Sequence, residues 1–230
     1  MHTRRCTMAV ITISRQYGSG GTEIAMRVSE MLGYSYLDKL IMTQIAEEVG
    51  LSMADLGEFS EEYTKVKNFL LRIVTPGPHT FVKVAIRKRD TSGEETSSTI
   101  QLNDARCAAL IRSAVHRAYQ QGNAVIVGRG GQATLQDMPG VLHVRIEAPL
   151  RARILRVQER EGIGFKEAER LVKRQDKIAE QYLHHLFGIR WDDSSLYHII
   201  INTAKWDVGA AAQLIADLAQ RMPADKAIIA

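Results

Sequence analysis

Hydrophobic positions along the chain follow two alternating patterns. Short, nearly continuous apolar runs occur in AVITIS, AVIV, VLHVRIEA and YHIIINT, which begin at residues 9, 124, 141 and 197. Runs of this kind are typical of strands buried on both faces of a parallel sheet. Between them lie helical stripes, such as residues 22–32, where Ile24, Val28 and Leu32 share one face and Gly33 follows the last turn. The pattern predicts an α/β fold in three layers, a mostly parallel sheet flanked by helices.

The other predicted elements follow the same alternation. A short strand is expected in YSYLD at 34–38, and the predicted helices cover 22–32, 39–49, 103–121, 150–161, 166–186 and 206–221. Residues 53–100 are less regular. The TPGPH sequence breaks this stretch, VKVAIRKR is compatible with a strand, and DTSGEETSST is typical of a mobile loop. We interpret 53–100 as an insertion that covers the substrate.

Composition sets the scale of the molecule. A chain of 230 residues with 45% hydrophobic content can bury a large core, and we predict a single domain over residues 8–222. No apolar run approaches the length of a membrane span, and the basic start MHTRRCT lacks a secretory cleavage pattern, with Met1 and Met8 both possible starts. Cys6 and Cys107 fit no metal or disulfide spacing, which favours the cytoplasm.

Charge is concentrated in one part of the chain. The net charge is +4, and residues 145–177 carry ten Lys and Arg against six Asp and Glu. This segment shows no interleaved aromatic residues and no helix-turn-helix signal, so it favours a compact phosphate ligand over nucleic acid. Most of these side chains are expected on solvated helix faces.

The segment from Ala9 to Ala25, AVITISRQYGSGGTEIA, joins a strand to a helix through a glycine-rich turn. Such turns bind phosphate because successive backbone N–H groups converge on an anion at the positive end of a helix. Aligned with G-x-x-x-x-G-K-[ST], the defining positions are Arg15, Gly20, Gly21 and Thr22. Arginine therefore replaces the first glycine, and glycine replaces the lysine. The alternative is a turn that serves only close packing.

Polar residues follow several predicted strands at the edge where ligands bind. Asp38 ends the second strand, Arg129 follows the strand in VIVGRGG, and Asn202 and Thr203 end the last. In α/β sheets, function collects at the carboxyl edge. Each residue also has a structural explanation, because Asp38 can cap a helix, Arg129 can pair with a carboxylate and Asn202 can form a turn.

Five blocks in order carry a family resemblance: ITISRQYGSGGTEIA, YLDKLI, VIVGRGG, KRQDKIAEQYLHHLFG and YHIIINT. Together they resemble the cytidylate kinase-like family of P-loop proteins, relatives of the nucleoside monophosphate kinases. The resemblance extends from Met8 to about Arg221 and implies transfer of the γ-phosphoryl group of ATP, with Mg²⁺, to a nucleoside monophosphate, CMP or dCMP.

The resemblance, together with the need of phosphoryl transfer for alignment and charge neutralisation, predicts roles for individual residues. Arg15 and the amides of Gly18, Ser19, Gly20, Gly21 and Thr22 would hold the donor phosphates, and the Thr22 hydroxyl would bind Mg²⁺. Arg129 and Asp38 would meet the acceptor. Residues 161–188 would form a lid, in which the resemblance implies catalytic roles for Arg170, Arg174 and Asp176.

Two departures from the family pattern affect this assignment. Gly130 stands where the family has the aspartate of a GRD motif, and Ala179 stands where the lid usually has an arginine. Two other functions therefore stay open: a nucleotide-binding sensor or scaffold with little kinase activity, and a kinase for another small acceptor. The sequence does not fix the acceptor or the oligomeric state.

Overall fold

The computed structural model describes residues 9–38, 82–89, 95–102 and 104–222. Its main sheet has five parallel strands in the order β2-β5-β1-β6-β7. Their bounds are β1 Val10–Arg15, β2 Ser35–Leu37, β5 Ala124–Val127, β6 Val141–Glu147 and β7 Ile199–Asn202. β1 is central, with Val10 opposite both Ala124 and Val141. This arrangement confirms the predicted parallel sheet.

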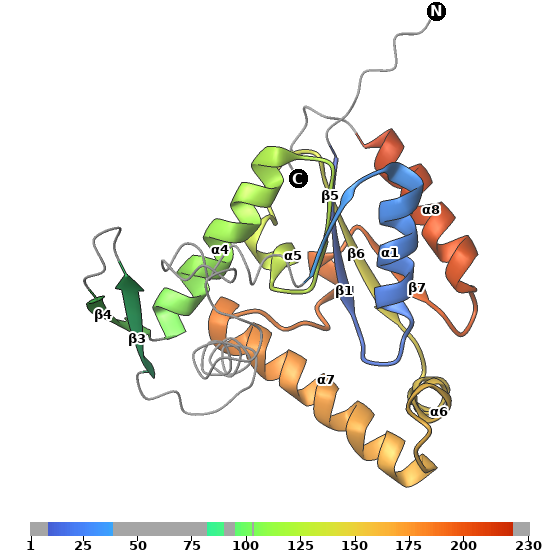
Figure 1. Ribbon diagram of the computed structural model, residues 1–230. Helices are drawn as coiled ribbons and strands as arrows, with labels where there is room; N and C mark the ends of the chain where they lie inside the picture. The colour runs from blue at the N-terminus through green and yellow to red at the C-terminus, as the bar shows by residue number, and fades with distance from the viewer. Residues whose placement is uncertain (1–8, 39–81, 90–94, 103, 223–230) are drawn as a thin grey trace, which may run out of the picture.

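Helices cover both faces of the sheet (Figure 1). α1 and α8 lie together on one face, and α4 and α5 lie on the other. The long helix α7 crosses below the carboxyl ends of the strands, beside α6. The bounds are α1 Gly21–Leu32, α4 Asp104–Gln121, α5 Gly131–Thr134, α6 Leu150–Glu161, α7 Phe165–Phe187 and α8 Val208–Arg221.

Two hydrophobic cores, one on each face, hold the three layers together. On one face, Ile11, Ile24 and Ile215 join β1 to α1 and α8. On the other, Ile126, Ile111 and Leu186 join β5 to α4 and α7. All are nearly or fully buried, and each such side chain stabilises the fold by about 1.5–3 kcal/mol. The strands read as continuous apolar runs because both of their faces are covered.

The observed elements match most of the predicted ones and correct three points. The predicted loop DTSGEETSST is wrong at residues 95–99, because β4, Glu95–Leu102, pairs with β3, Val82–Arg89, as an antiparallel hairpin. The strand ETSSTIQL lacks apolar alternation in its first half, so the pattern did not indicate it. The last helix begins at Val208 instead of Trp206, and the short α5 was not predicted. The predicted helix 39–49 lies outside the described residues.

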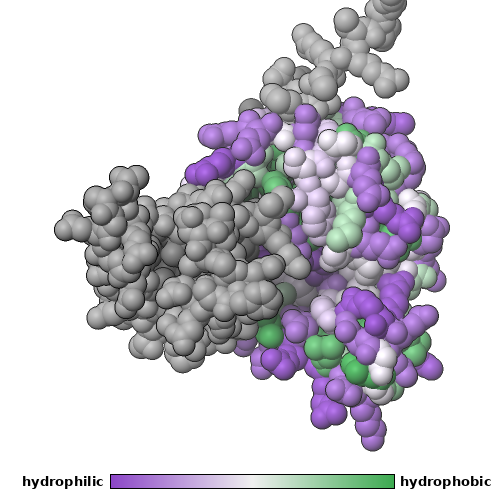
Figure 2. All heavy atoms as spheres, viewed as in Figure 1, coloured by the Kyte–Doolittle hydropathy of each residue, from purple (hydrophilic) through white to green (hydrophobic). Residues whose placement is uncertain are grey.

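Hydrophilic residues cover most of the described surface on the face shown in Figure 2, with hydrophobic residues in small separate areas. Within the described ranges, no helix is both long and apolar enough to cross a bilayer.

A buried histidine in β6 gives the fold a pH-dependent stability. The Nε2–H of His143 faces the Leu135 carbonyl at 3.2 Å, so its Nδ1 accepts from the Thr12 hydroxyl at 2.7 Å. Its ring stacks on His198, with 5.2 Å between centroids. Burial, and secondarily His198, lowers the pKa of His143 from 6.5 to about 4. The imidazole therefore stays neutral in the folded protein well below the pH at which it is protonated in the unfolded chain.

We predict that the free energy of unfolding falls as the pH drops from 6.5 to 4. The unfolded chain binds a proton in this range that folded His143 does not, so the stability present above pH 6.5 decreases by about 3 kcal/mol. Urea unfolding at several pH values measures this slope. His143→Gln is expected to flatten it, whereas His184→Gln on the exposed side of α7 should keep it. An unchanged slope in His143→Gln would contradict the assignment.

Candidate functional site

The glycine-rich segment forms a loop over residues 16–20 between β1 and α1. Gly18 and Gly20 adopt left-handed backbone angles, with φ of 78° and 80°, and Gly20 is the N-cap of α1 without a side-chain cap. The Ile24 N–H donates to the Gly20 carbonyl at 3.0 Å, which begins the helical hydrogen bonding. The N–H groups of the first turn have no partners within the helix. The loop therefore has the backbone geometry that binds a phosphate.

A clasp of two charged residues, Arg153 and Asp176, holds the middle of this loop. Asp176 of α7 accepts from the Tyr17 N–H at 3.0 Å and pairs with Arg153 of α6 at 2.5 Å. Arg153 also donates to the Tyr17 carbonyl at 3.1 Å, so both backbone groups of Tyr17 are held. The resemblance implied a catalytic role for Asp176, whereas the geometry shows a side chain that ties the loop to the two helices.

Residues at the end of the sheet support the loop from the other side. The Thr203 hydroxyl donates to the Ser19 carbonyl at 2.8 Å, and Arg156 donates to the Thr203 hydroxyl and carbonyl at 2.8 and 2.6 Å. The Gln16 side-chain oxygen accepts from the Ala148 N–H at 3.0 Å. Thr203 thus acts on the loop, as its place at the carboxyl edge suggested. Arg153 and Arg156 were missed individually, although both lie in the basic segment 145–177.

Arg15 ends β1 and extends its guanidinium to the end of β5, where it lies against Gly128. Burial is the main cause that lowers its pKa; nearby Arg129 lowers it further, while the Asp38 carboxylate opposes the shift. An arginine stays protonated at neutral pH, so the lowered pKa indicates a cation with too little compensating negative charge. A bound phosphate would supply that charge.

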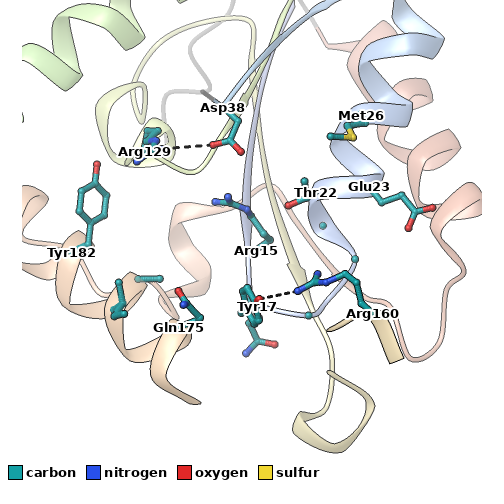
Figure 3. Close-up of a pocket in the computed structure, with 16 residues that line it drawn as sticks. Arg15, Tyr17, Thr22, Glu23, Met26, Asp38, Arg129, Arg160, Gln175 and Tyr182 are labelled. Atoms are coloured by element: carbon teal, nitrogen blue, oxygen red, sulfur yellow. Dashed lines mark hydrogen bonds and ion pairs between the residues drawn. The ribbon is translucent and has the colours of Figure 1, made fainter. Parts of the chain in front are cut away.

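Asp38 and Arg129 meet at the carboxyl edge, as their positions after two strands predicted. The Arg129 side chain is 17% exposed and the Asp38 side chain 21% exposed. The Arg129 Nη2 atom lies 3.9 Å from the Asp38 Oδ1 atom. Arg129 has a φ of 55°, which is uncommon outside glycine and is often found where function constrains the backbone. Figure 3 shows the pair at the top of the pocket, above Arg15.

The ring of Phe187 explains why the residue after Arg129 is glycine. A Cβ atom on Gly130 would overlap this ring, which comes from the end of α7. An aspartate at this position, as in the family's GRD motif, has no room in this packing.

Helix α7 faces the pocket with side chains that carry no charge. Gln175, Ile178, Ala179 and Tyr182 line the pocket, and Figure 3 shows Gln175 and Tyr182 on the helix opposite the sheet. Arg170 and Arg174 are exposed and are not among the lining residues. The Arg170 Nε donates to the Lys166 carbonyl at 3.3 Å. The structure therefore does not bring these two arginines to the loop.

An arginine that the sequence did not single out, Arg160, lines the pocket near the loop. Its guanidinium lies over the Tyr17 ring, 5.2 Å from the centroid, and donates to the Tyr17 hydroxyl at 2.8 Å. It also pairs with Glu161 at 2.9 Å. The basic excess of residues 145–177 was the only signal for this residue.

These groups surround one pocket of about 500 Å³. Among the described residues, its wall carries three arginines and two carboxylates, together with the loop and the start of α1. Glu23 and Asp38 are the carboxylates, and exposed Thr22 lies beside Glu23 on α1 (Figure 3). Hydroxyl and carboxylate oxygens suit Mg²⁺. Over the part of the chain that the structure describes, no three His, Cys, Asp or Glu residues form a metal cluster. The lining comprises Arg15, Gln16, Tyr17, Gly18, Gly20, Gly21, Thr22, Glu23, Met26, Asp38, Arg129, Arg160, Gln175, Ile178, Ala179 and Tyr182.

The strand order, the loop and the helix that follows it define a P-loop fold. The profile of the cytidylate kinase-like family matches residues 10–205, so the chain belongs to this family. The cytidylate kinase of Pyrococcus horikoshii is 28% identical over 199 residues, which cover 86% of this chain and 81% of that protein. The cytidylate kinase of Methanopyrus kandleri is 29% identical over 199 residues, which cover 86% of this chain and 86% of that protein.

A solved structure has a similar fold. An uncharacterized protein from Eubacterium ventriosum superposes with a TM-score of 0.60 at 22% identity, covering 92% of this chain and 98% of that one. At this identity, the likeness concerns the fold alone.

Proposed function

We propose that this protein is a kinase that transfers the γ-phosphoryl group of ATP to a nucleoside monophosphate, with CMP and dCMP as the first candidates. One observation carries the proposal: a single pocket joins the glycine-rich loop to Arg15, Arg129 and Arg160. Phosphoryl transfer needs alignment and charge neutralisation more than covalent chemistry, and these groups provide both. The names of the archaeal relatives support the acceptor class.

The donor phosphates would bind to the backbone N–H groups of Gly18, Gly20, Gly21 and Thr22, since the Ser19 N–H already donates to the Gln16 carbonyl at 3.2 Å. Arg15 would neutralise the transferring phosphoryl group, because its side chain lines the pocket beside the loop and its pKa is lowered mainly by desolvation. Arg160 would contact the donor from the opposite wall, where it is already positioned by the Tyr17 ring.

The pocket also fits a magnesium ion. The Thr22 hydroxyl would hold it, with Glu23 beside Thr22 on α1 as the nearest carboxylate of the pocket lining. When bound, Mg²⁺ neutralises charge on the donor phosphates.

The acceptor phosphate would bind to Arg129, whose planar guanidinium can donate two parallel hydrogen bonds. Asp38 would orient this arginine through their ion pair or accept a hydrogen bond from the acceptor itself. All of these groups would belong to the single domain proposed over 8–222, and most of the insertion predicted over 53–100 lies outside the described residues, at 53–81 and 90–94. Residues 161–188 would act as the lid, with Gln175 and Tyr182 as its pocket-facing groups.

The placement of the α6 and α7 arginines leads to a prediction. Arg160→Ala should raise the KM for ATP about tenfold, because a charge-assisted hydrogen bond to phosphate contributes roughly 1.5–3 kcal/mol. Arg170→Ala and Arg174→Ala should stay within about twofold of wild type, because both side chains are exposed and neither lines the pocket. Initial rates against ATP concentration test this. A large loss in Arg174→Ala alone would mean that α7 must move to supply the arginine.

Product formation tests the proposed function. Purified protein is incubated with ATP and Mg²⁺ and with each common ribo- and deoxyribonucleoside monophosphate in turn, and ADP and the new diphosphate are measured. The proposal expects acceleration by CMP or dCMP with one diphosphate formed per ADP. ATP binding without transfer to any monophosphate would reject it in favour of a nucleotide sensor or a kinase for another small acceptor.

A further inference from the structure

Positions 15 and 21 share one space at the junction of β1 and α1. A Cβ atom on Gly21 would lie 2.5 Å from the Cβ of Arg15 and 3.2 Å from the Cβ of Ile146. Cβ atoms are fixed to the backbone, so no rotamer change relieves this contact. As the backbone stands, one of the two positions must be glycine.

The same two positions define the cation of a phosphate-binding loop. In G-x-x-x-x-G-K-[ST], the first position is glycine and the seventh is lysine. Here the first position is Arg15 and the seventh is Gly21. The motif and this chain therefore each have one cation and one glycine at these two positions, but the glycine and the cation have exchanged places.

A second glycine makes room for the far end of Arg15. A Cβ atom on Gly128 would overlap the Arg15 Nη1, and Gly128 has a φ of 70°. The guanidinium therefore occupies the place of a side chain at the end of β5. Figure 3 shows it below Asp38 and Arg129, with Thr22 to its right at the start of α1.

We propose that Gly21 and Gly128 are positioning residues that seat Arg15, and that this arginine replaces the loop lysine by entering from β1 instead of α1. The phosphate contact in this inference rests on the proposed function, whereas the steric exchange does not. The cation then reaches the transferring phosphoryl group from the acceptor side, next to Arg129.

A thermal-unfolding cycle tests the exchange without any activity. Gly21→Ala is introduced into wild type, Arg15→Ala, which keeps the Cβ, and Arg15→Gly, which removes it. The melting temperature should fall by several degrees, on the order of 5 °C, in the first two backgrounds, because overpacking is destabilising. Most of this loss should disappear in the Arg15→Gly background. An equal loss in all three backgrounds would overturn the exchange.

ATP binding tests the functional half. Arg15→Gly should raise the dissociation constant for ATP roughly tenfold or more. The double variant Arg15→Gly with Gly21→Lys should recover most of the lost affinity. A folded double variant that binds no better than Arg15→Gly would overturn the replacement of lysine. If wild type binds no ATP, the proposed function fails and the replacement of lysine falls with it, while the thermal cycle still decides the exchange.

Gly128 has a matched control for backbone strain. Gly33 has a φ of 65° and no atom within 4 Å of an added Cβ, so Gly33→Ala imposes a similar strain without touching Arg15. Gly128→Ala should weaken ATP binding severalfold, and Gly33→Ala should leave it unchanged. Equal ATP affinity in the two variants would overturn the role of Gly128.

Discussion

Arg15→Ala is expected to lower the kcat of phosphoryl transfer by about a thousandfold. Arginines that stabilise the charge of a transferring phosphoryl group contribute about 10³–10⁵ in kcat. Arg15 lines the pocket and its pKa is lowered, mainly by burial, so a negatively charged ligand would stabilise its cation. Steady-state rates with saturating ATP and acceptor measure the loss.

Two further variants control for charge and for general damage. Arg15→Lys keeps the charge without the planar fork, and its kcat should lie between wild type and Arg15→Ala. Arg190→Ala removes an arginine that is 77% exposed and should leave kcat unchanged. A loss of less than tenfold in Arg15→Ala would contradict the assigned role.

Asp176→Asn is expected to lower the free energy of unfolding by about 3 kcal/mol. The Arg153 side chain is only 6% exposed and would lose its charged partner, and breaking a buried ion pair costs about 3–5 kcal/mol. We expect the lower end of this range because the Asp176 side chain is 19% exposed and water can partly solvate the group left without its partner. An asparagine also cannot accept from both Arg153 and the Tyr17 N–H in the manner of two carboxylate oxygens. Urea unfolding at neutral pH measures the change.

A surface pair supplies the control for this variant. Asp192 pairs with Arg190 at 3.2 Å, and both side chains are more than half exposed. Asp192→Asn should therefore leave the free energy of unfolding almost unchanged, because solvent screens an exposed ion pair. If Asp176→Asn is as mild as Asp192→Asn, the clasp does not hold the loop.

Local sequence patterns predicted the parts of the fold that depend on local physics. The buried strands and the helices over 150–161 and 165–187 follow from apolar periodicity, and Gly33, Gly162 and Gly188 end helices in left-handed conformations. The β4 strand was missed because its first half, ETSS, is polar and gains order from pairing with β3.

The site was predictable where a strand end determines position. Asp38 and Arg129 were expected together, and they are. The clasp of Arg153 and Asp176 joins residues 23 positions apart with Tyr17, 159 positions away from Asp176, and only the packed fold brings them together. Likewise, the helical face on which Arg170 and Arg174 lie depends on how α7 packs across the strand ends. From the sequence, Gly130 was interpreted as the loss of the aspartate in the GRD motif. In the structure, the Phe187 ring occupies the space that a side chain at this position would need.

The fate of the γ-phosphoryl group tests the central claim most directly. The protein is mixed with Mg²⁺, ATP labelled at the γ-phosphate and CMP, and the products are separated. We predict that the label appears in CDP in step with ADP, and that Arg15→Ala nearly abolishes it. Label found only in inorganic phosphate, or label transfer that is the same in Arg15→Ala, would contradict a kinase whose loop cation is Arg15.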